Sequence, residues 1–138
     1  MAQAFTVSRE LDRPADTVWQ QLTDWDRAGG WLGVDSLRAE GPTAVGTELV
    51  FTARGKERRS EIVALEPGRS ITLRSRQGGV TADYTYAVEP AGAGSLATLT
   101  ADVRTPGGWS LLGPVIRRAI RNEDSGQLDA LAQTLTTR

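Results

Sequence analysis

Glycine and proline divide the middle of the chain, residues 34–105, into segments of strand length. Apolar and polar side chains alternate within most segments, and the dividers are residues that favour turns. Strands of this length, spaced by about 10–14 residues and joined by short turns, predict an antiparallel meander. The predicted strands are residues 47–54, 57–66, 70–76, 80–89 and 95–104.

A further strand is predicted before the meander, at residues 4–12. Phe5, Val7 and Leu11 fall on one face of an extended chain, and polar side chains fall on the other. This alternation is typical of a half-buried strand.

A helix is predicted to follow the first strand. Pro14 suits the first helical position, because proline needs no hydrogen bond to its nitrogen there. We expect the helix to fade near residues 24–26, before a Gly-Gly pair. Its apolar stripe consists of Val18, Trp19 and Leu22.

Residues 109–137 carry a second helical pattern. Three arginines take the face opposite the apolar one, and Pro114 suits an N-terminal position, so a long amphipathic helix is predicted from near Gly113. Gly126 is expected to weaken it. The apolar face contains Leu112, Val115, Ile116, Ala119, Ile120, Leu128, Leu131 and Leu135.

The residue types present exclude several kinds of chemistry. The chain has no cysteine and no histidine, so disulfides, thiol nucleophiles, Cys/His zinc sites and histidine-based catalysis are excluded. No acidic cluster has the spacing of an all-carboxylate metal site. The single lysine, Lys56, lies in a predicted exposed turn that suits Schiff-base chemistry poorly. We therefore predict no catalytic residue, no metal and no cofactor.

Length and charge narrow the class of protein. A chain of 138 residues predicts one domain, residues 1–138, and a net charge of -1 gives no field to hold a nucleic acid. No apolar stretch approaches the roughly 18 residues of a membrane span. The first residues have neither the basic nor the apolar region of a signal peptide, so we expect a cytoplasmic protein.

The chain contains five recognisable stretches: "RELDRPADTVWQQLTDWDRAGGWLG", which is the most specific, "GTELVF", "VALEPGRSITL", "GSLATLT" and "LDALAQTL". Together they resemble the START-like, Bet v 1-like (SRPBCC) superfamily, and specifically its polyketide cyclase/dehydrase and lipid-transport branch. The resemblance covers nearly the whole chain. It implies an α+β helix-grip fold, in which a seven-stranded antiparallel sheet wraps around a long C-terminal helix, with two short helices after the first strand. It does not fix a function, because members carry lipids, hormones or pigments, cyclise polyketides or assist chaperones.

This architecture leaves room for a cavity, because one helix cannot fill a curled sheet of six or seven strands. Alternation assigns an inward face to each strand. Residues 58–65 are ambiguous, since Ile62 and Ala64 compete with Val63 and Leu65. The inward residues elsewhere are Leu49, Phe51 and Ala53; Ile71, Leu73 and Ser75; Ala82, Tyr84, Tyr86 and Val88; Ala97, Leu99, Ala101 and Val103; and Leu112, Ile116 and Ile120 of the last helix.

The tryptophans Trp19, Trp25 and Trp31 are each six residues apart, a spacing that fits neither one helix face nor a strand. The segment must therefore change direction. We expect Trp19 to anchor the first helix under the sheet, and Trp25 to be partly exposed or packed on a neighbouring loop. The resemblance places Trp31 at the cavity entrance and Trp109 near a loop that borders it, with plain core packing as the alternative.

Two features favour a pocket over a solid core. Several inward residues are small, and Tyr84 and Tyr86 put hydroxyl groups on an apolar face. Either a ligand or water at the rim would satisfy those hydroxyls. The predicted ligand-binding residues are Trp31, Phe51, Leu73, Tyr84, Tyr86, Leu99, Trp109, Leu112, Ile116 and Ile120.

Three functions remain open. The favoured one is binding or transport of a hydrophobic small molecule, such as a lipid, an isoprenoid or an aromatic polyketide. The second is a polyketide aromatase/cyclase, with Tyr84 and Tyr86 polarising a carbonyl. The third is a co-chaperone-like interaction module or a homodimer, which the basic turn at residues 54–59 supports only weakly because a solvated loop is the favoured interpretation of that turn.

Overall fold

A computed structural model of the chain describes residues 2–25, 36–53, 55–77, 80–104 and 130. Within this part the chain forms seven strands and the helix α1, Ala15–Leu22. The strands are β1 (Ala2–Leu11), β2 (Ser36–Ala39), β3 (Glu48–Ala53), β4 (Lys56–Glu66), β5 (Ser70–Gln77), β6 (Val80–Ala91) and β7 (Gly94–Arg104).

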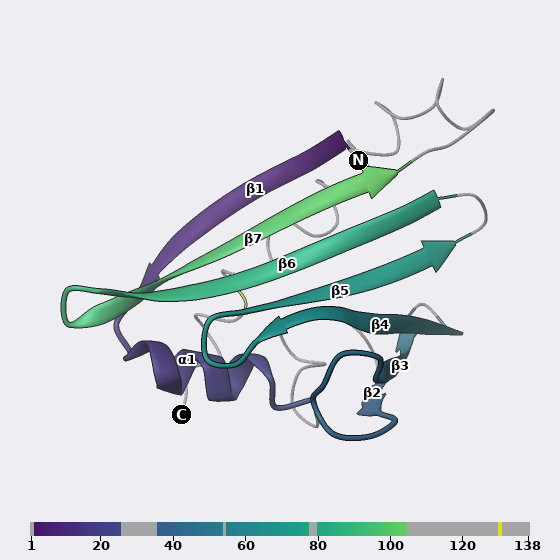
Figure 1. The fold of residues 1–138 in the computed structure, drawn as a ribbon, viewed down its shortest axis with the longest axis horizontal. Coiled ribbons are helices and arrows are strands. Elements are labelled where there is room, and N and C mark those ends of the chain that lie inside the picture. The colour runs from purple at the N-terminus through teal and green to yellow at the C-terminus, as the bar shows by residue number, and fades with distance from the viewer. Residues whose placement is uncertain (1, 26–35, 54, 78–79, 105–129, 131–138) are drawn as a thin grey trace.

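The strands form one antiparallel sheet in the order β1-β7-β6-β5-β4-β3-β2 (Figure 1). From β2 to β7 each strand pairs with the next one along the chain, which is the predicted meander. β1 pairs with β7 and forms the opposite edge. The prediction of a seven-stranded antiparallel sheet is therefore confirmed. β2, with four residues, is the strand that the residue pattern did not delimit.

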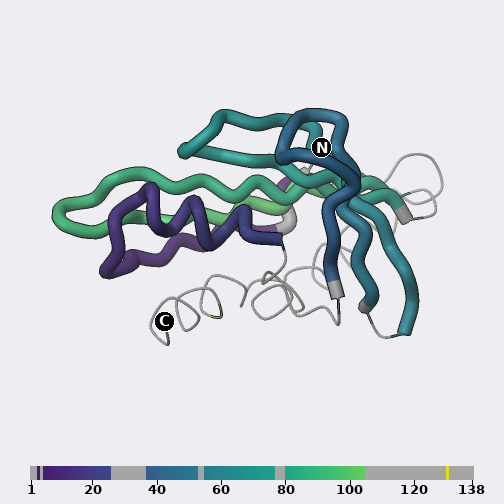
Figure 2. The backbone as a smooth tube through the Cα atoms, turned by 90° about the horizontal axis from the view of Figure 1, so that it is seen from below, coloured from purple at the N-terminus to yellow at the C-terminus, as the bar shows by residue number. Residues whose placement is uncertain are grey.

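Helix α1 lies against one face of the sheet, over β6 and β7 (Figure 2). We call this the inner face. Val18 and Leu22 of α1 are buried as predicted. Trp19 is only partly buried at the edge of the core, and Gln21 takes the third buried position of the helix.

The bounds of α1 differ slightly from the prediction. The helix begins at Ala15, directly after Pro14, and ends at Leu22 rather than near residues 24–26. The N–H of Asp24 donates to the carbonyl of Gln21 at 3.4 Å, which tightens the last turn and ends the helical pattern. Trp25 then turns into the core, where its ring is buried.

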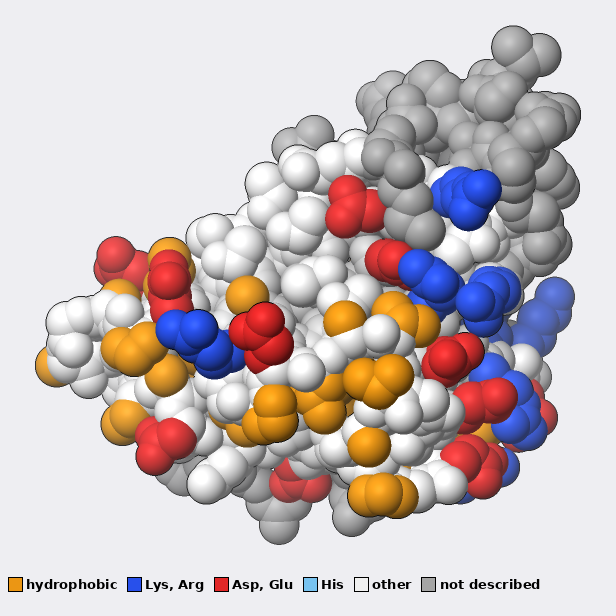
Figure 3. Space-filling view, viewed as in Figure 1, with side chains coloured by type: hydrophobic (Ala, Val, Ile, Leu, Met, Phe, Trp, Pro, Cys, Tyr) orange, Lys and Arg blue, Asp and Glu red, His pale blue; other side chains and the backbone are white. Residues whose placement is uncertain are grey.

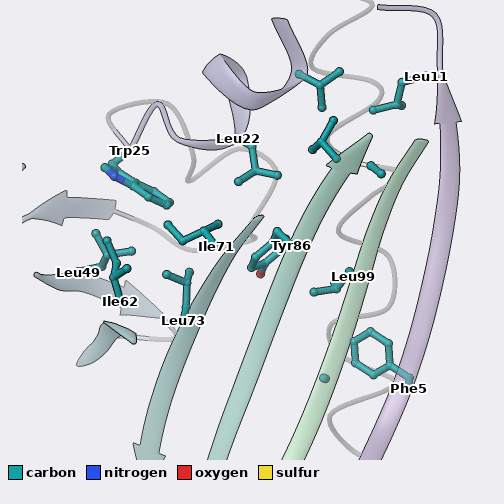
Figure 4. Packing of buried hydrophobic residues seen from close by; sticks show 14 residues of the cluster. Phe5, Leu11, Leu22, Trp25, Leu49, Ile62, Ile71, Leu73, Tyr86 and Leu99 are labelled. Carbon is teal, nitrogen blue, oxygen red and sulfur yellow. The ribbon is translucent and has the colours of Figure 1, made fainter. Parts of the chain in front are cut away.

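The inner face carries the core, and regular alternation predicted it correctly in β5, β6 and β7. Large side chains from the sheet meet Leu22 and Trp25 there (Figure 4). The predicted inward residues that are buried are Leu49, Ile71, Leu73, Ala82, Tyr86, Val88, Ala97, Leu99, Ala101 and Val103.

A β-bulge explains why the inward face of residues 58–65 was ambiguous. The register of β4 against β5 shifts between Ile62 and Ala64. Ile62 lies opposite Leu73, and Leu65 lies opposite Ile71, so both face inward although they are three residues apart. Because the bulge adds one residue, simple alternation fails in this strand.

Strand β3 departs from the prediction for Phe51. Phe51 is only partly buried, whereas the neighbouring Val50 is buried on the outer face. Val50 lies opposite Arg38 of β2 and Arg59 of β4. These arginines form ion pairs with glutamates of the same face, and the stems of such long side chains cover apolar surface. The hydrogen bond from Arg59 to Glu48, at 2.8 Å, raises the pKa of the Arg59 guanidinium.

Elsewhere the outer face carries charged side chains interspersed with hydrophobic ones (Figure 3). Arg74 of β5 donates two hydrogen bonds to the Asp83 carboxylate on β6, at 2.7 and 2.8 Å, and these bonds raise the pKa of Arg74. Cross-strand hydroxyl pairs lie beside them, including Thr72 with Thr85 at 2.9 Å. The buried apolar cluster lies on the other side of the sheet and identifies the inner face as the one where a site can form.

The predicted second short helix and the long C-terminal helix lie outside the described residues, except that Ala130 is helical. Within the described part of the chain, no helix is long and apolar enough to cross a membrane.

Candidate ligand-binding site

Four of the predicted ligand-binding residues come together at the centre of the inner face. Leu73 of β5 lies opposite Tyr84 of β6, and one step along the sheet Tyr86 lies opposite Leu99 of β7. Leu73, Tyr86 and Leu99 are buried, and Tyr84 is partly buried. Alternation along β6 places both phenol rings on the inner face, two residues apart.

The other predicted residues stand differently. Phe51 lies opposite Leu37 and Arg58, on the strands β2 and β4, and the structure does not bring it into the two central rows. The remaining five lie outside the described residues: Trp31, Trp109, Leu112, Ile116 and Ile120.

Beside the central rows runs a row of small residues. Ser60, Ser75 and Ala82 lie opposite one another on β4, β5 and β6. The Ser60 and Ser75 hydroxyls are 2.7 Å apart and share a hydrogen bond. Ser60 is buried and Ser75 is partly buried. This row offers little side-chain volume and one hydroxyl pair on an otherwise apolar face.

The sequence reasoning recognised Ser75 as a small inward residue but missed Ser60. The signal was present, because Ser60 and Ile62 are two residues apart and share a face. The bulge after Ile62 hid it, since alternation read across the whole strand gave two conflicting answers.

Gln21 is the second polar group that the sequence reasoning missed. Its side chain is 1% exposed. Within the described residues its amide nitrogen Nε2 and oxygen Oε1 are both buried without a hydrogen-bond partner. Its spacing of three residues from Val18 was the available signal, because i and i+3 share a helix face.

Trp25 packs beside the loop between β2 and β3. Its ring is buried, and its indole Nε1–H donates to the Thr43 hydroxyl at 3.0 Å. This bond confirms the prediction that Trp25 packs on a neighbouring loop and excludes the partly exposed alternative. Trp25 thus holds this loop against the core.

The described residues provide no group of three or more acidic side chains that would hold a metal ion. The arrangement supplies instead apolar contact area, two phenols and a hydroxyl pair. These groups are suited to binding an apolar molecule and to orienting it through a few hydrogen bonds.

Comparisons with known proteins identify the family and the fold of the chain. The family described as polyketide cyclase/dehydrase and lipid transport matches residues 2–136. Protein MLL2253 from Mesorhizobium loti has a similar structure, with a TM-score of 0.77, 18% identity and 96% of each chain covered. A comparison with curated protein sequences gave no match.

Two further solved structures share the fold. Ara h 8.0201 has a TM-score of 0.72 and 18% identity, with 97% of each chain covered. DynU16, from the dynemicin biosynthetic locus, has a TM-score of 0.69 and 19% identity, and the match covers 96% of this chain and 46% of that one. The family match confirms the predicted resemblance to the polyketide cyclase/dehydrase and lipid-transport branch, and the similar structures confirm the fold.

Proposed function

We propose that this chain, which belongs to the polyketide cyclase/dehydrase and lipid transport family, binds a hydrophobic small molecule on the inner face of its sheet. Either ligand binding or a cyclase-like role is consistent with membership of this family. We propose binding without turnover as the primary function. The contact residues we propose are those predicted from the sequence, together with the row Ser60, Ser75 and Ala82.

The row of small residues carries the proposal. Leu73 and Tyr84 lie opposite one another beside it, so a ligand over the row would contact large apolar side chains along its length. The Ser60–Ser75 pair keeps hydrogen-bonding capacity after its mutual bond, because each hydroxyl has one donor and two acceptor positions. The row therefore combines small side chains, apolar contact and a polar contact.

Apolar burial sets the size of ligand that can bind. Burying one methylene group contributes about 0.8 kcal/mol. A twelve-carbon chain therefore contributes about 9 kcal/mol before the loss of translational and rotational freedom, about 4–15 kcal/mol. We expect weak binding of short apolar molecules and tighter binding of long or polycyclic ones.

A titration with N-phenyl-1-naphthylamine, a neutral apolar fluorophore, tests the proposal. We expect saturable binding at about one molecule per chain, with displacement by long-chain lipids or polycyclic aromatics. Absence of saturable binding of the fluorophore, and of every member of such a set measured by calorimetry, would refute it.

Polyketide cyclisation is the second candidate, and the two adjacent inward phenols, Tyr84 and Tyr86, favour it. A phenol can donate a hydrogen bond to a carbonyl and polarise it while the surrounding face folds the chain for attack. The double substitution Tyr84→Phe, Tyr86→Phe should then lower turnover of a poly-β-ketone substrate by about 100-fold and leave binding of N-phenyl-1-naphthylamine intact. Unchanged turnover would remove both tyrosines from the mechanism.

A further inference from the structure

The side-chain amide of Gln21 is a buried polar group that lacks hydrogen bonds to the described residues. Both of its heteroatoms are buried without a partner, in the part of the chain that the structure describes. Most buried polar side chains find a hydrogen-bond partner, since an unsatisfied one destabilises the folded state. Glutamine at this position therefore makes physical sense if something else binds the amide.

The position of Gln21 suits a role at the proposed site. The helix α1 packs over β6 and β7 on the inner face, and Val18 and Leu22 on either side of Gln21 belong to the core. Figure 4 shows Leu22 above Ile71 and Tyr86. Ser75 follows Ile71 by four residues, which is about 13 Å along the strand. The hydroxyl pair therefore lies well along the sheet from the level of α1.

We propose that Gln21 is the polar anchor of the ligand and binds a neutral head group in which a donor and an acceptor lie side by side. A carboxamide accepts one hydrogen bond at Oε1 and donates another from Nε2, and it cannot balance a buried charge. Primary amides, protonated carboxylic acids and hydroxy ketones have the matching pattern. This inference rests on the proposed function, because it concerns the same site.

Two pairs of probes separate the head group from the body of the ligand. Dodecanamide carries the full pattern, and N,N-dimethyldodecanamide has the same chain but no donor. The corresponding pair with an aromatic body is 2-naphthamide and N,N-dimethyl-2-naphthamide. Displacement of N-phenyl-1-naphthylamine gives the affinity of each probe.

The test compares the wild-type chain with Gln21→Met, which keeps the length of the side chain and removes both polar atoms. Ser95→Ala is the matched control, because Ser95 Oγ is also buried without a partner among the described residues but lies at the start of β7, opposite Leu11. Gln21→Leu replaces the methionine variant if that variant does not fold.

We expect the wild type and Ser95→Ala to prefer the primary amide over its dimethyl partner by about tenfold, which corresponds to about 1.4 kcal/mol. Gln21→Met should bind the two amides of each pair with about equal affinity, and its melting temperature should not fall. Because the preference is a ratio, a general weakening of the site does not change it. A preference in the dodecyl pair indicates a lipid-like ligand, and one in the naphthyl pair indicates an aromatic ligand.

Two results would overturn the proposal while leaving the binding function intact. One is a wild type that binds the probes without preference, as expected if buried water satisfies the amide. The other is a preference that survives in Gln21→Met. If none of the probes binds the wild type, the binding function itself fails.

Discussion

A larger side chain in the row of small residues tests whether this part of the inner face is a ligand site or a solid core. A ligand site predicts a rise in the free energy of unfolding, and a solid core predicts a fall. Ala82 is 6% exposed and lies between Ser75 and Val103 on the inner face. Ala82→Leu adds three carbon atoms there. If the space is open to a ligand, burying these atoms stabilises the fold by up to about 2.4 kcal/mol. If the face is already filled, overpacking destabilises it by about 1–3 kcal/mol.

We expect the first outcome, together with a loss of apolar binding of at least about tenfold, because the leucine takes volume from the ligand. Urea unfolding measures the stability, and titration with N-phenyl-1-naphthylamine measures the binding. Ala87→Leu is the control, since Ala87 is on the same strand but on the outer face, opposite Ser70 and Thr98. A destabilised Ala82→Leu with unchanged affinity would refute the reasoning.

Three further changes test the structure around the site. Trp25→Phe keeps one aromatic ring but removes the rest of the indole and its bond to Thr43. It should lower the free energy of unfolding in urea by at least about 0.5–1.5 kcal/mol, which is the contribution of the bond alone; no change would mean that the bond does not hold the loop. Gly94→Ala would bring a Cβ into collision with the carbonyl oxygen of Leu11, so we expect a loss of at least about 2 kcal/mol, and wild-type stability would contradict the pairing of β1 with β7. Arg74→Met removes the two-bond ion pair, whose side chains are 30% and 14% exposed, and should lower stability by about 1 kcal/mol. Because the pKa of Arg74 is raised in the folded state, the ion pair stabilises the fold fully below the ordinary pKa of arginine. This stabilisation disappears only as the pH rises through the higher pKa of the folded state. Urea unfolding should therefore show the same destabilisation by Arg74→Met at pH 7 and at pH 10.

Strands β5, β6 and β7 were predictable because their pairing is regular. Each residue of β6 from Thr81 to Ala87 has a partner on both neighbouring strands without a register shift. In such strands the side-chain period of two holds, so the apolar set identifies the buried face. This is why Leu73, Tyr84, Tyr86 and Leu99 could be grouped from the sequence.

The differences between the predicted and the observed buried faces have local causes, which the two-residue alternation of a strand cannot reveal. The bulge in β4 moves the inward set by one residue after Ile62. Val50 is buried on the outer face because Arg38 and Arg59 flank it from neighbouring strands, which is a tertiary effect. Phe51 accordingly contributes less to the core than its hydrophobicity predicted.

The polar groups of the site were the hardest part to predict. A glutamine in an amphipathic helix is normally assigned to solvent, and a serine in an ambiguous strand gives no preference. Gln21 and Ser60 were placed inside only when the packing of α1 and the register of β4 were known. Buried polar residues of this kind break the pattern that predicts the fold.

Native mass spectrometry of the protein, gently purified from its own host and compared with its denatured mass, tests the central claim most directly. We predict one added small molecule per chain that disappears on denaturation, with an apolar body and an uncharged head group. A bare chain mass in the native spectrum, from protein that also fails to bind N-phenyl-1-naphthylamine, would contradict the claim that the inner face binds a hydrophobic ligand.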